Sequence, residues 1–289
     1  MGAPLMRAAE GLVRITRPVP KSGEMIPVIG LGTSRVFDVG STAPERAAVK
    51  SVLATLAEAG GCVVDSSPMY GRAEVVVGEL VAAADLRSRL FLASKVWTTG
   101  RDAGIEQVES SLRRMGAGRM DLMQVHNLID VKTQLATLRK LKEAGRVRYV
   151  GVSHWNASGH AELEKTLREE ELDFVQLNYS IVEREVETRL LPLATERRVA
   201  VLVNRPFARG GLFDKVRGKQ LPDWAASFDA ATWGQFFLKF VVSHPAVTAA
   251  IPATAKVEHL RDNLAAGFGR LPDQAMRERM AAMFATIHD

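Results

Sequence analysis

Four side chains that can donate, accept or stabilise a proton stand at or just after the ends of apolar runs. Asp65 ends VVD, Lys95 ends FLASK and His126 ends LMQVH, while Tyr70 follows in the segment SPMYG. An ammonium beside a phenol favours the phenolate and lowers the pKa of the phenol. We therefore expect Tyr70, next to Lys95, to serve as a general acid near neutral pH. Asp65 would keep Lys95 charged, and His126 would orient a carbonyl group.

These residues need elements that bring the ends of separate runs together. The chain alternates short apolar runs with longer amphipathic stretches. The apolar runs predict strands at 27–33, 62–67, 90–97, 120–126, 146–154, 173–180, 199–206 and 247–254. The amphipathic stretches predict helices at 44–59, 73–84, 105–115, 131–144, 158–170, 185–198, 232–243 and 257–268, with a last helix at 273–287. Pro192 should kink the helix that contains it or delay its start.

Eight strand–helix units in this order predict an α/β fold of the (β/α)8 TIM barrel type. The runs are continuously apolar, as is usual for parallel strands covered on both faces. The alternative is a doubly wound open sheet, but GLGTSR after the first strand lacks the third glycine of a dinucleotide-binding turn. The carboxyl ends of barrel strands meet at one mouth, so we expect Asp65, Lys95 and His126 to lie there.

The whole chain, residues 1–289, is expected to form one barrel domain. Within residues 1–24, the segment around Val13–Ile15 should pair with the segment before Ile26 as a hairpin that covers the bottom of the barrel. Residues 205–231 form the longest stretch without clear periodicity, and a loop of that length is often functional. The last predicted helix lies beyond the eight units and would be an extra C-terminal helix.

The composition excludes several classes of protein. The formal net charge is 38 − 33 = +5 over 289 residues. Cys62 is the single cysteine, which excludes an intramolecular disulfide and a zinc site built from several cysteines. No apolar run approaches the roughly 18–20 residues that span a bilayer, and the N-terminus lacks an apolar core of signal-peptide length. We expect a cytoplasmic monomer or small homo-oligomer without a membrane partner. Because the positive and negative charges are interspersed, we also expect no nucleic-acid partner.

The chain resembles the aldo-keto reductases over nearly its whole length. Asp65, Tyr70, Lys95 and His126 match the catalytic tetrad of that family in order. The segments that carry the resemblance are IGLGT, VVDSSPMYGRAEVVVGE, LFLASKVW, DLMQVHN, GVSHWN, VQLNYS and IPATAKVEHLRDNL. The resemblance implies a barrel that binds NADPH or NADH without a Rossmann domain or a metal. It also implies hydride transfer to an aldehyde or ketone, with Tyr70 as the proton donor.

The same resemblance assigns residues to the cofactor, and NADPH is favoured over NADH. The assigned residues are Gly32, Thr33, Ser34, Ser153, His154, Gln176, Asn204, Arg205, Pro206, Phe207, Pro252, Ala253, Thr254, Lys256, His259 and Asn263. Ser153 and Gln176 match the residues that hold the nicotinamide carboxamide. Asn263 matches the residue that contacts adenine.

The nicotinamide end departs from the family's pattern at two positions. His154 replaces an asparagine of the carboxamide site. Asn204 and Arg205 stand where an aromatic ring often stacks on the nicotinamide. Arg205 could stack by its guanidinium plane or bind phosphate, and Phe207 could supply the ring.

The phosphate end departs from the pattern as well. Ala253 and His259 replace a lysine and an arginine that commonly grip the 2′-phosphate of NADPH. Lys256 or Arg261, at the start of the following helix, could compensate. A helix N-terminus also favours phosphate without a charged side chain.

The substrate is expected to be a small carbonyl compound. Met69 precedes Tyr70, and Trp97 and Trp155 follow strand ends, so all three are expected to line its pocket; packing under loops is the alternative for the two tryptophans. Arg205 and Arg209 suggest an anionic substrate, although phosphate groups of the cofactor would use the same charges.

Two other functions fit the same residues. A metal-dependent hydrolase on a barrel would use Asp65, His126 and His154 as ligands, but GLGTS lacks the His-x-His that is common after the first strand of such barrels. A nucleotide-binding regulatory subunit would keep the fold and hardly turn over. Bound metal would identify the first, and nucleotide binding without turnover would identify the second.

Overall fold

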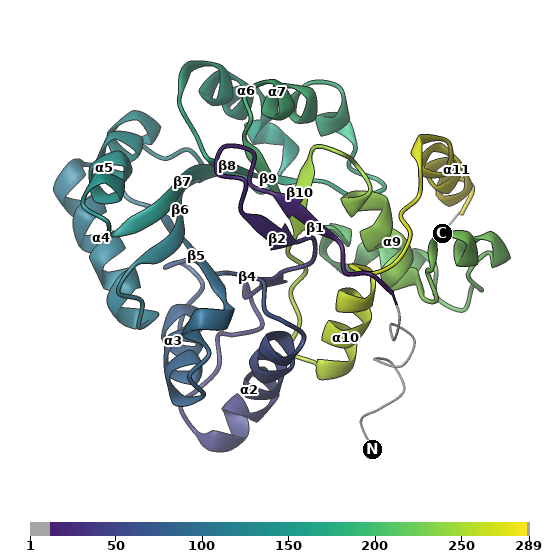
Figure 1. Cartoon of the computed structure of the whole chain (residues 1–289), viewed down its shortest axis with the longest axis horizontal. Coiled ribbons are helices and arrows are strands. Elements are labelled where there is room, and N and C mark those ends of the chain that lie inside the picture. Colours follow the sequence, from purple (N-terminus) through teal and green to yellow (C-terminus); the bar gives the residue numbers. More distant parts are fainter. Residues whose placement is uncertain (1–11, 288–289) are drawn as a thin grey trace.

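A computed structural model describes residues 12–287, which form a barrel of eight parallel strands with helices around it (Figure 1). In chain order around the barrel the strands are β3 (Leu31–Gly32), β4 (Val63–Asp65), β5 (Phe91–Val96), β6 (Met120–His126), β7 (Val147–Ser153), β8 (Phe174–Asn178), β9 (Ala200–Asn204) and β10 (Val247–Ala250). The ring closes because the N–H of Ala250 donates to the Val28 oxygen at 2.9 Å and the N–H of Gly30 donates to the Ala250 oxygen at 2.8 Å. The (β/α)8 prediction is confirmed, and the open sheet is wrong.

The barrel interior is apolar at one end and polar at the other. Successive side chains of a strand point to opposite faces, so Phe91, Ala93 and Lys95 of β5 share the inner face. Phe91 and Ala93 belong to the interior apolar cluster, together with the rings of Tyr149 and Phe174. These three rings lie with centroids 6.0, 5.9 and 5.4 Å apart. The apolar filling therefore ends below Lys95, and polar side chains occupy the carboxyl ends of the strands.

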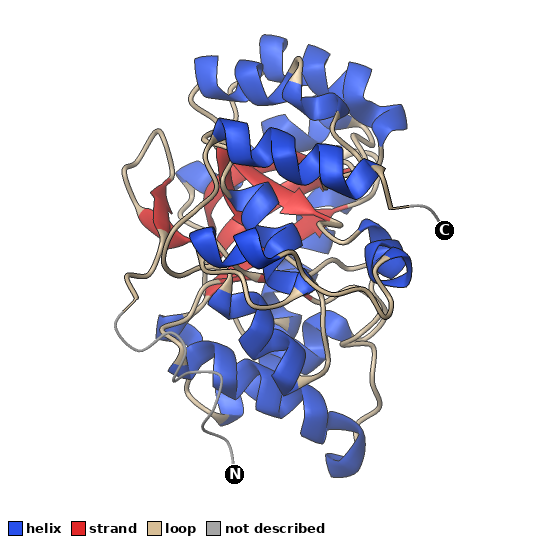
Figure 2. Ribbon diagram, turned by 90° about the vertical axis from the view of Figure 1, so that its right-hand side faces the viewer, coloured by secondary structure: helices blue, strands red, loops and turns tan. Residues whose placement is uncertain are grey.

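A hairpin covers the apolar end of the barrel. β1 (Thr16–Pro18) and β2 (Met25–Pro27) pair antiparallel and stand at one end of the barrel (Figure 2). Val19 and Ile26 are buried and belong to the interior cluster. The predicted hairpin is confirmed, but its first strand begins one residue beyond the predicted segment 13–15. The part of the predicted N-terminal segment before residue 12 lies outside the described residues.

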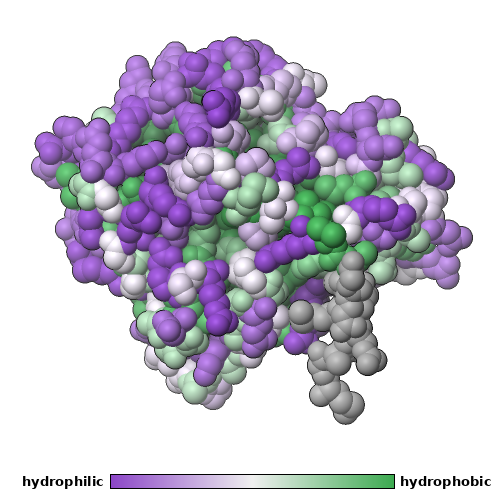
Figure 3. Space-filling view, in the orientation of Figure 1, coloured by the Kyte–Doolittle hydropathy of each residue, from purple (hydrophilic) through white to green (hydrophobic). Residues whose placement is uncertain are grey.

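The helices cover the outside of the barrel and pack on a second apolar core between helices and strands. Their bounds are α2 (Ala43–Glu58), α3 (Ala73–Ala83), α4 (Arg101–Arg114), α5 (Val131–Glu143), α6 (His160–Glu169), α7 (Leu190–Glu196), α9 (Trp233–Val242) and α10 (Val257–Ala265). Hydrophilic residues dominate the outer helices on the face drawn in Figure 3. Among the helices of residues 12–287, none is sufficiently long and apolar to span a bilayer.

Two helix starts differ from the prediction by four or five residues. α4 begins at Arg101, four residues before the predicted start at 105. α7 begins at Leu190 instead of 185, after a separate 3-10 turn at Glu185–Glu187. Pro192 lies in the first turn of α7, where its missing N–H would have no helical partner in any case. The delayed start expected from Pro192 is therefore confirmed.

The segment 205–231 contains short helices, although its sequence shows no periodicity. They are a 3-10 turn at Ala208–Gly210, α8 (Gly211–Lys215) and a 3-10 helix at Asp223–Phe228. The rings of Trp224 and Phe228 pack on Phe236 of α9, with centroids 5.7 and 5.9 Å away. These contacts hold the C-terminal part of the segment against α9.

The extra C-terminal helix is present as α11 (Gln274–Ala285) and lies beside α9 (Figure 1). Its buried Arg277 donates to the Tyr179 hydroxyl at 2.5 Å and to a Glu187 carboxylate oxygen at 2.7 Å. Breaking a buried ion pair leaves an uncompensated charge, so Arg277 anchors the helix to the loop after β8.

Candidate active site

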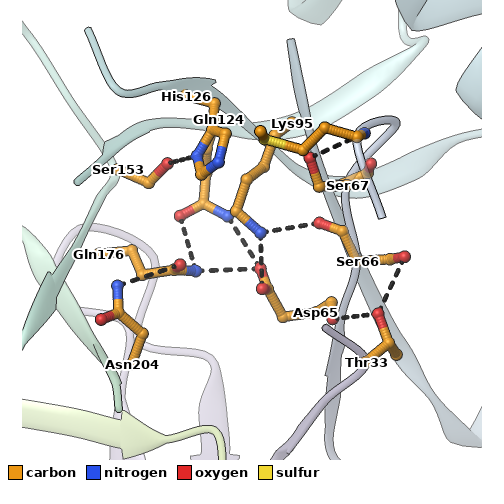
Figure 4. Close-up of polar contacts among 12 residues, drawn as sticks. Thr33, Asp65, Ser66, Ser67, Lys95, Gln124, His126, Ser153, Gln176 and Asn204 are labelled. Carbon is orange, nitrogen blue, oxygen red and sulfur yellow. Dashed lines mark hydrogen bonds and ion pairs between the residues drawn. The ribbon is translucent and has the colours of Figure 1, made fainter. Parts of the chain in front are cut away.

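An ion pair lies inside the carboxyl end of the barrel. Lys95 Nζ is 2.6 Å from Asp65 Oδ2, and the two side chains are 0% and 4% exposed. Lys95 also donates to the backbone oxygen of Ser66 at 2.7 Å (Figure 4). A charge at this depth is costly unless it is paired and hydrogen-bonded. The structure therefore brings together two of the predicted residues, and each of the two buried charges needs the other as its partner.

Two glutamines hold the second oxygen of the same carboxylate. Gln124 Nε2 and Gln176 Nε2 donate to Asp65 Oδ1 at 3.2 and 3.0 Å (Figure 4). Gln124 is fully buried in β6 and was not among the predicted site residues. It precedes His126 by two positions, so the strand period places both side chains on the inner face. That spacing was the available signal for it.

Tyr70 lies beside the ion pair, in the turn after β4. Lys95 Nζ is 5.1 Å from the centroid of its ring. Burial raises the pKa of Tyr70, and the opposing effect of Lys95 is smaller, so the net shift is upward. The predicted lowering of the Tyr70 pKa is therefore wrong in sign, because desolvation of the phenolate outweighs the ammonium. The phenol keeps its proton at neutral pH.

Lys95 keeps its charge despite its burial. Burial alone would lower the pKa of Lys95, but Asp65 and Tyr70 together outweigh it and raise that pKa. An ammonium in this position can stabilise a phenolate on Tyr70.

His126 faces Tyr70 across the mouth. Its ring centroid is 6.4 Å from that of Tyr70, with the planes at 86°. Burial, followed by the positive charges of Lys95 and His154, lowers the pKa of His126 to about 3. The neutral ring has one N–H to donate, and Nδ1 lies 2.9 Å from the Ser153 hydroxyl (Figure 4). When that hydroxyl donates to Nδ1, the N–H is on Nε2.

The residues expected at the nicotinamide form a chain of hydrogen bonds. Asn204 Nδ2 donates to the backbone oxygen of His154 at 3.0 Å. It also lies 3.4 Å from Gln176 Oε1 (Figure 4). His154 Nδ1 is 3.0 Å from the backbone oxygen of Asn156. Ser153 and Gln176 are brought to the mouth as predicted, but they also position His126 and Asp65.

The turn after β3 lies next to the same mouth. The Thr33 hydroxyl is buried and donates toward the Asp65 backbone oxygen and the Ser66 hydroxyl, each at 3.0 Å (Figure 4). A side chain at Gly32 would place Cβ 2.8 Å from the Ile251 backbone oxygen. Glycine thus permits the close approach of the strands, and Thr33 braces the end of β4. Ser34 is half-buried at the mouth.

The residues after β9 approach the loop after β7. Arg205 Nη1 donates to the Trp155 backbone oxygen at 2.8 Å. Pro206 is buried. The ring of Phe207 packs against Phe213 with centroids 4.9 Å apart, so it belongs to an aromatic contact within its own segment.

The residues after β10 surround the start of α10. Pro252 is buried and Ala253 is exposed. Thr254 Oγ1 accepts from the backbone N–H of Lys256 at 3.0 Å. The side chain of Lys256, at the N-terminus of α10, is exposed.

Within α10, His259 is exposed, Asn263 is buried and Arg261 is half-buried. Arg261 Nε is a buried donor without a hydrogen-bond partner in the described part of the chain. Buried donors are normally satisfied, so this nitrogen suits an anion.

Apolar side chains form the outer rim of the mouth. Met69, Trp97 and Trp155 are 40%, 43% and 38% exposed, and Ile129 is 37% exposed. Large apolar groups that cluster around a polar centre are typical of a ligand pocket. Ile129 was not among the predicted residues.

The donor set fits a nicotinamide nucleotide better than a metal. Asn204 Oδ1 and Arg205 Nε are buried and have no partner among residues 12–287, and a carboxamide and a phosphate supply the missing donor and acceptor. Asp65, proposed as a metal ligand, already accepts from Lys95 and two glutamines, and the ammonium would repel a cation. No cluster of three or more metal-ligating side chains occurs within the described residues.

Comparison with known proteins identifies the family. The profile of the aldo/keto reductase family matches residues 28–282. Methylglyoxal reductase YeaE of Escherichia coli is 31% identical over 252 residues, covering 84% of this chain and 87% of that protein.

Solved structures agree with the family match. An aldo-keto reductase from Klebsiella pneumoniae in complex with NADPH superposes with a TM-score of 0.78 at 27% identity, covering 94% of this chain and 95% of that one. An aldo/keto reductase from the same organism in complex with NADP and acetate gives a TM-score of 0.77 at 27% identity, covering 94% and 96%. The chain therefore belongs to the aldo/keto reductase family. The predicted family and the predicted class of oxidoreductase are confirmed with it.

His126 should make the stability of the fold depend on pH. Its pKa in the folded chain is about 3, below the ordinary 6.5, so the unfolded chain binds one proton more as the pH falls from 6.5 towards 3. The free energy of unfolding should decrease over this range by up to about 1.4 kcal/mol per pH unit from this group. Urea unfolding at several pH values from about 7 to 5 measures the slope.

In the His126→Asn variant, the slope of the unfolding free energy against pH should be smaller by the contribution of one proton, up to about 1.4 kcal/mol per pH unit. The slope should not vanish, because burial also lowers the pKa of His244, to about 4, and that group remains. Equal slopes in the wild type and the variant would show that His126 is not held neutral in the folded chain.

Proposed function

We propose that this protein reduces an aldehyde or ketone to the alcohol with NADPH, and that Tyr70 is the proton donor. The observation that carries the proposal is the Asp65–Lys95 pair beside Tyr70: the buried ammonium lies 5.1 Å from the ring of a phenol that holds its proton. Membership of the aldo/keto reductase family supports the reaction.

When bound, the reduced nicotinamide supplies the hydride that adds to the carbonyl carbon. The Tyr70 hydroxyl hydrogen-bonds the carbonyl oxygen and transfers its proton to it as the alcohol forms. Lys95 stabilises the phenolate left on Tyr70, and Asp65 keeps Lys95 charged. The neutral ring of His126 donates an N–H to the same carbonyl oxygen and thereby orients it.

The cofactor residues proposed are those at the mouth and around α10. Asn204, with Ser153 and Gln176, would hold the carboxamide, and the unpartnered Asn204 Oδ1 supports this. Arg261 would take over the grip on the 2′-phosphate, because Ala253 carries no charge there. The NADPH complex of the Klebsiella pneumoniae relative supports NADPH as the cofactor.

The single domain, the cytoplasmic location and the monomeric or small homo-oligomeric state stay predictions from the sequence. Met69, Trp97 and Trp155 are proposed to line the pocket for a small carbonyl substrate, and their exposure at the mouth supports this.

Replacing Tyr70 by Phe should abolish turnover and spare cofactor binding. Loss of a general acid costs at least about a hundredfold in rate, whereas NADPH affinity should change little because the phenol acts on the substrate. NADPH fluorescence titration and NADPH oxidation with a panel of small aldehydes measure the two effects.

Tyr149→Phe is the matched control. This substitution removes a hydroxyl at the opposite end of the barrel, where the Tyr149 hydroxyl donates to a Glu24 carboxylate oxygen at 2.7 Å. The variant should retain turnover. Parallel loss of NADPH binding and turnover in Tyr70→Phe would make Tyr70 structural. A wild type that binds NADPH without turnover on any aldehyde would favour the regulatory subunit.

Replacing Arg261 by Met should weaken NADPH and spare NADH. The 2′-phosphate is present in NADPH and absent from NADH. Loss of one charged hydrogen bond to it should increase the dissociation constant of NADPH about tenfold. Arg113→Met, on the exposed face of α4, removes the same charge and should leave both nucleotides unaffected. Equal weakening of NADPH and NADH would contradict the assignment of Arg261 to the 2′-phosphate.

A further inference from the structure

The turn between β4 and α3 carries Tyr70, and other parts of the chain hold its ends. We call residues 66–72 the tyrosine turn. Within it, the Tyr70 N–H donates to the Ser67 backbone oxygen at 3.1 Å, and the Ala73 N–H donates to the Tyr70 backbone oxygen at 3.1 Å. Arg72, the residue before α3, makes no side-chain cap for that helix. The local hydrogen bonds therefore shape the middle of the turn and leave the start of α3 to an acceptor from elsewhere.

The loop after β3 contacts both ends of the tyrosine turn. At the first end, the Thr33 hydroxyl lies 3.0 Å from the Ser66 hydroxyl (Figure 4). At the second end, the backbone N–H of Arg72 donates to Asp38 Oδ1 at 2.9 Å. An N–H at the start of a helix has no acceptor within that helix, so the Asp38 carboxylate supplies one from a separate loop. A negative charge at this place also interacts favourably with the helix dipole.

Gly71 lies directly against the Asp38 carboxylate. A Cβ at position 71 would overlap the carboxylate group. Gly71 also has a φ of 58°, in the left-handed region that favours glycine. The residue after Tyr70 therefore carries no side chain, and the carboxylate occupies the space that a side chain would fill. A change at Asp38 would thus act on the backbone one residue away from Tyr70.

Asp38 is itself held in place by its neighbour Phe37. The Phe37 ring is fully buried in the outer core, and its N–H donates to the Thr33 backbone oxygen at 3.1 Å. The charges that act on the pKa of Tyr70 are those of the buried ion pair in the mouth, and Asp38 is not among them. Asp38 therefore acts on Tyr70 through the backbone of the turn and not through its charge.

We propose that Asp38 is a positioning residue for Tyr70. Its carboxylate accepts the Arg72 N–H, packs against Gly71, and so keeps the phenol beside Lys95. This inference rests on the proposed reductase function, in which Tyr70 protonates the carbonyl oxygen. A misplacement of about 1 Å in a reacting group can cost about a hundredfold in rate, so the loss of this support should reduce the rate of the chemical step.

The test compares Asp38→Ala with Asp38→Asn. Alanine removes the acceptor, whereas asparagine keeps Oδ1 as an acceptor for the Arg72 N–H and removes only the charge. Single-turnover oxidation of enzyme-bound NADPH by a small aldehyde measures the chemical step. Asp38→Ala should lose about tenfold in this rate constant, with little change in KM or in the dissociation constant of NADPH. Asp38→Asn should keep most of the rate.

Asp273→Ala is the matched control. Asp273 Oδ1 accepts the backbone N–H of Met276 at 2.8 Å at the start of α11, a helix that contributes none of the proposed site residues. The two alanine variants should lose stability against urea to a similar extent, but Asp273→Ala should keep the single-turnover rate of the wild type.

Three outcomes would overturn the proposal. An unchanged rate in Asp38→Ala would show that the turn needs no support from this loop. An equal loss of rate in Asp38→Ala and Asp38→Asn would show that the charge matters and the hydrogen bond does not. A loss of NADPH affinity in parallel with the loss of rate would assign Asp38 to the cofactor.

Hydrogen exchange keeps the inference distinct from the proposed function. Amide exchange in peptides that cover residues 66–73 should be faster in Asp38→Ala and close to that of the wild type in Asp38→Asn and Asp273→Ala. Faster exchange in Asp38→Ala, combined with a wild type that reduces no aldehyde, would contradict the reductase function and retain Asp38 as the support of the turn. Unchanged exchange in Asp38→Ala would overturn the inference itself.

Discussion

A charged ammonium can lie inside a barrel only when a neighbouring group compensates it, and Asp65 does so for Lys95 at 2.6 Å. The other polar contacts of the mouth follow from this pair. Gln124 and Gln176 hold the second carboxylate oxygen, so the carboxylate is fixed from two sides. The apolar rings at the bottom of the barrel and the hairpin beneath them keep water from that side of the pair.

Burial and charge act against each other on the two proton-handling groups next to this pair. For Tyr70, burial raises the pKa more than Lys95 lowers it, so the phenol is protonated before the reaction. In the proposed mechanism, Lys95 matters after proton transfer, when the phenolate exists. For His126, burial and the positive charges act in the same direction and lower its pKa to about 3. The mouth thus holds one acid that retains its proton and one neutral donor, an arrangement that suits the proposed reduction of a carbonyl.

The strand order and the meeting of Asp65, Lys95 and His126 could be predicted from the sequence, because parallel strands of regular period place their ends at one mouth. Gln124 could also have been predicted from the sequence, because a residue two positions before His126 in the same strand points to the same inner face. The sign of the Tyr70 pKa shift could not be predicted, because it depends on the depth of burial, which spacing does not give. The short helices in 205–231 could not be predicted either. Contacts with other side chains stabilise them, and four left-handed residues of this segment, Arg205, Ala208, Arg209 and Asp229, are not glycines.

The most direct test of the account is the pKa of the Tyr70 phenol in the wild type and in Lys95→Met, measured by ultraviolet difference titration. The chain has three tyrosines, so each titration is corrected with the corresponding Tyr70→Phe protein, and circular dichroism verifies that each variant is folded. If Lys95 stabilises the phenolate, its removal should raise the pKa of Tyr70 by about one unit or more. An unchanged or lower pKa in Lys95→Met would contradict the central role of the Lys95–Asp65 pair.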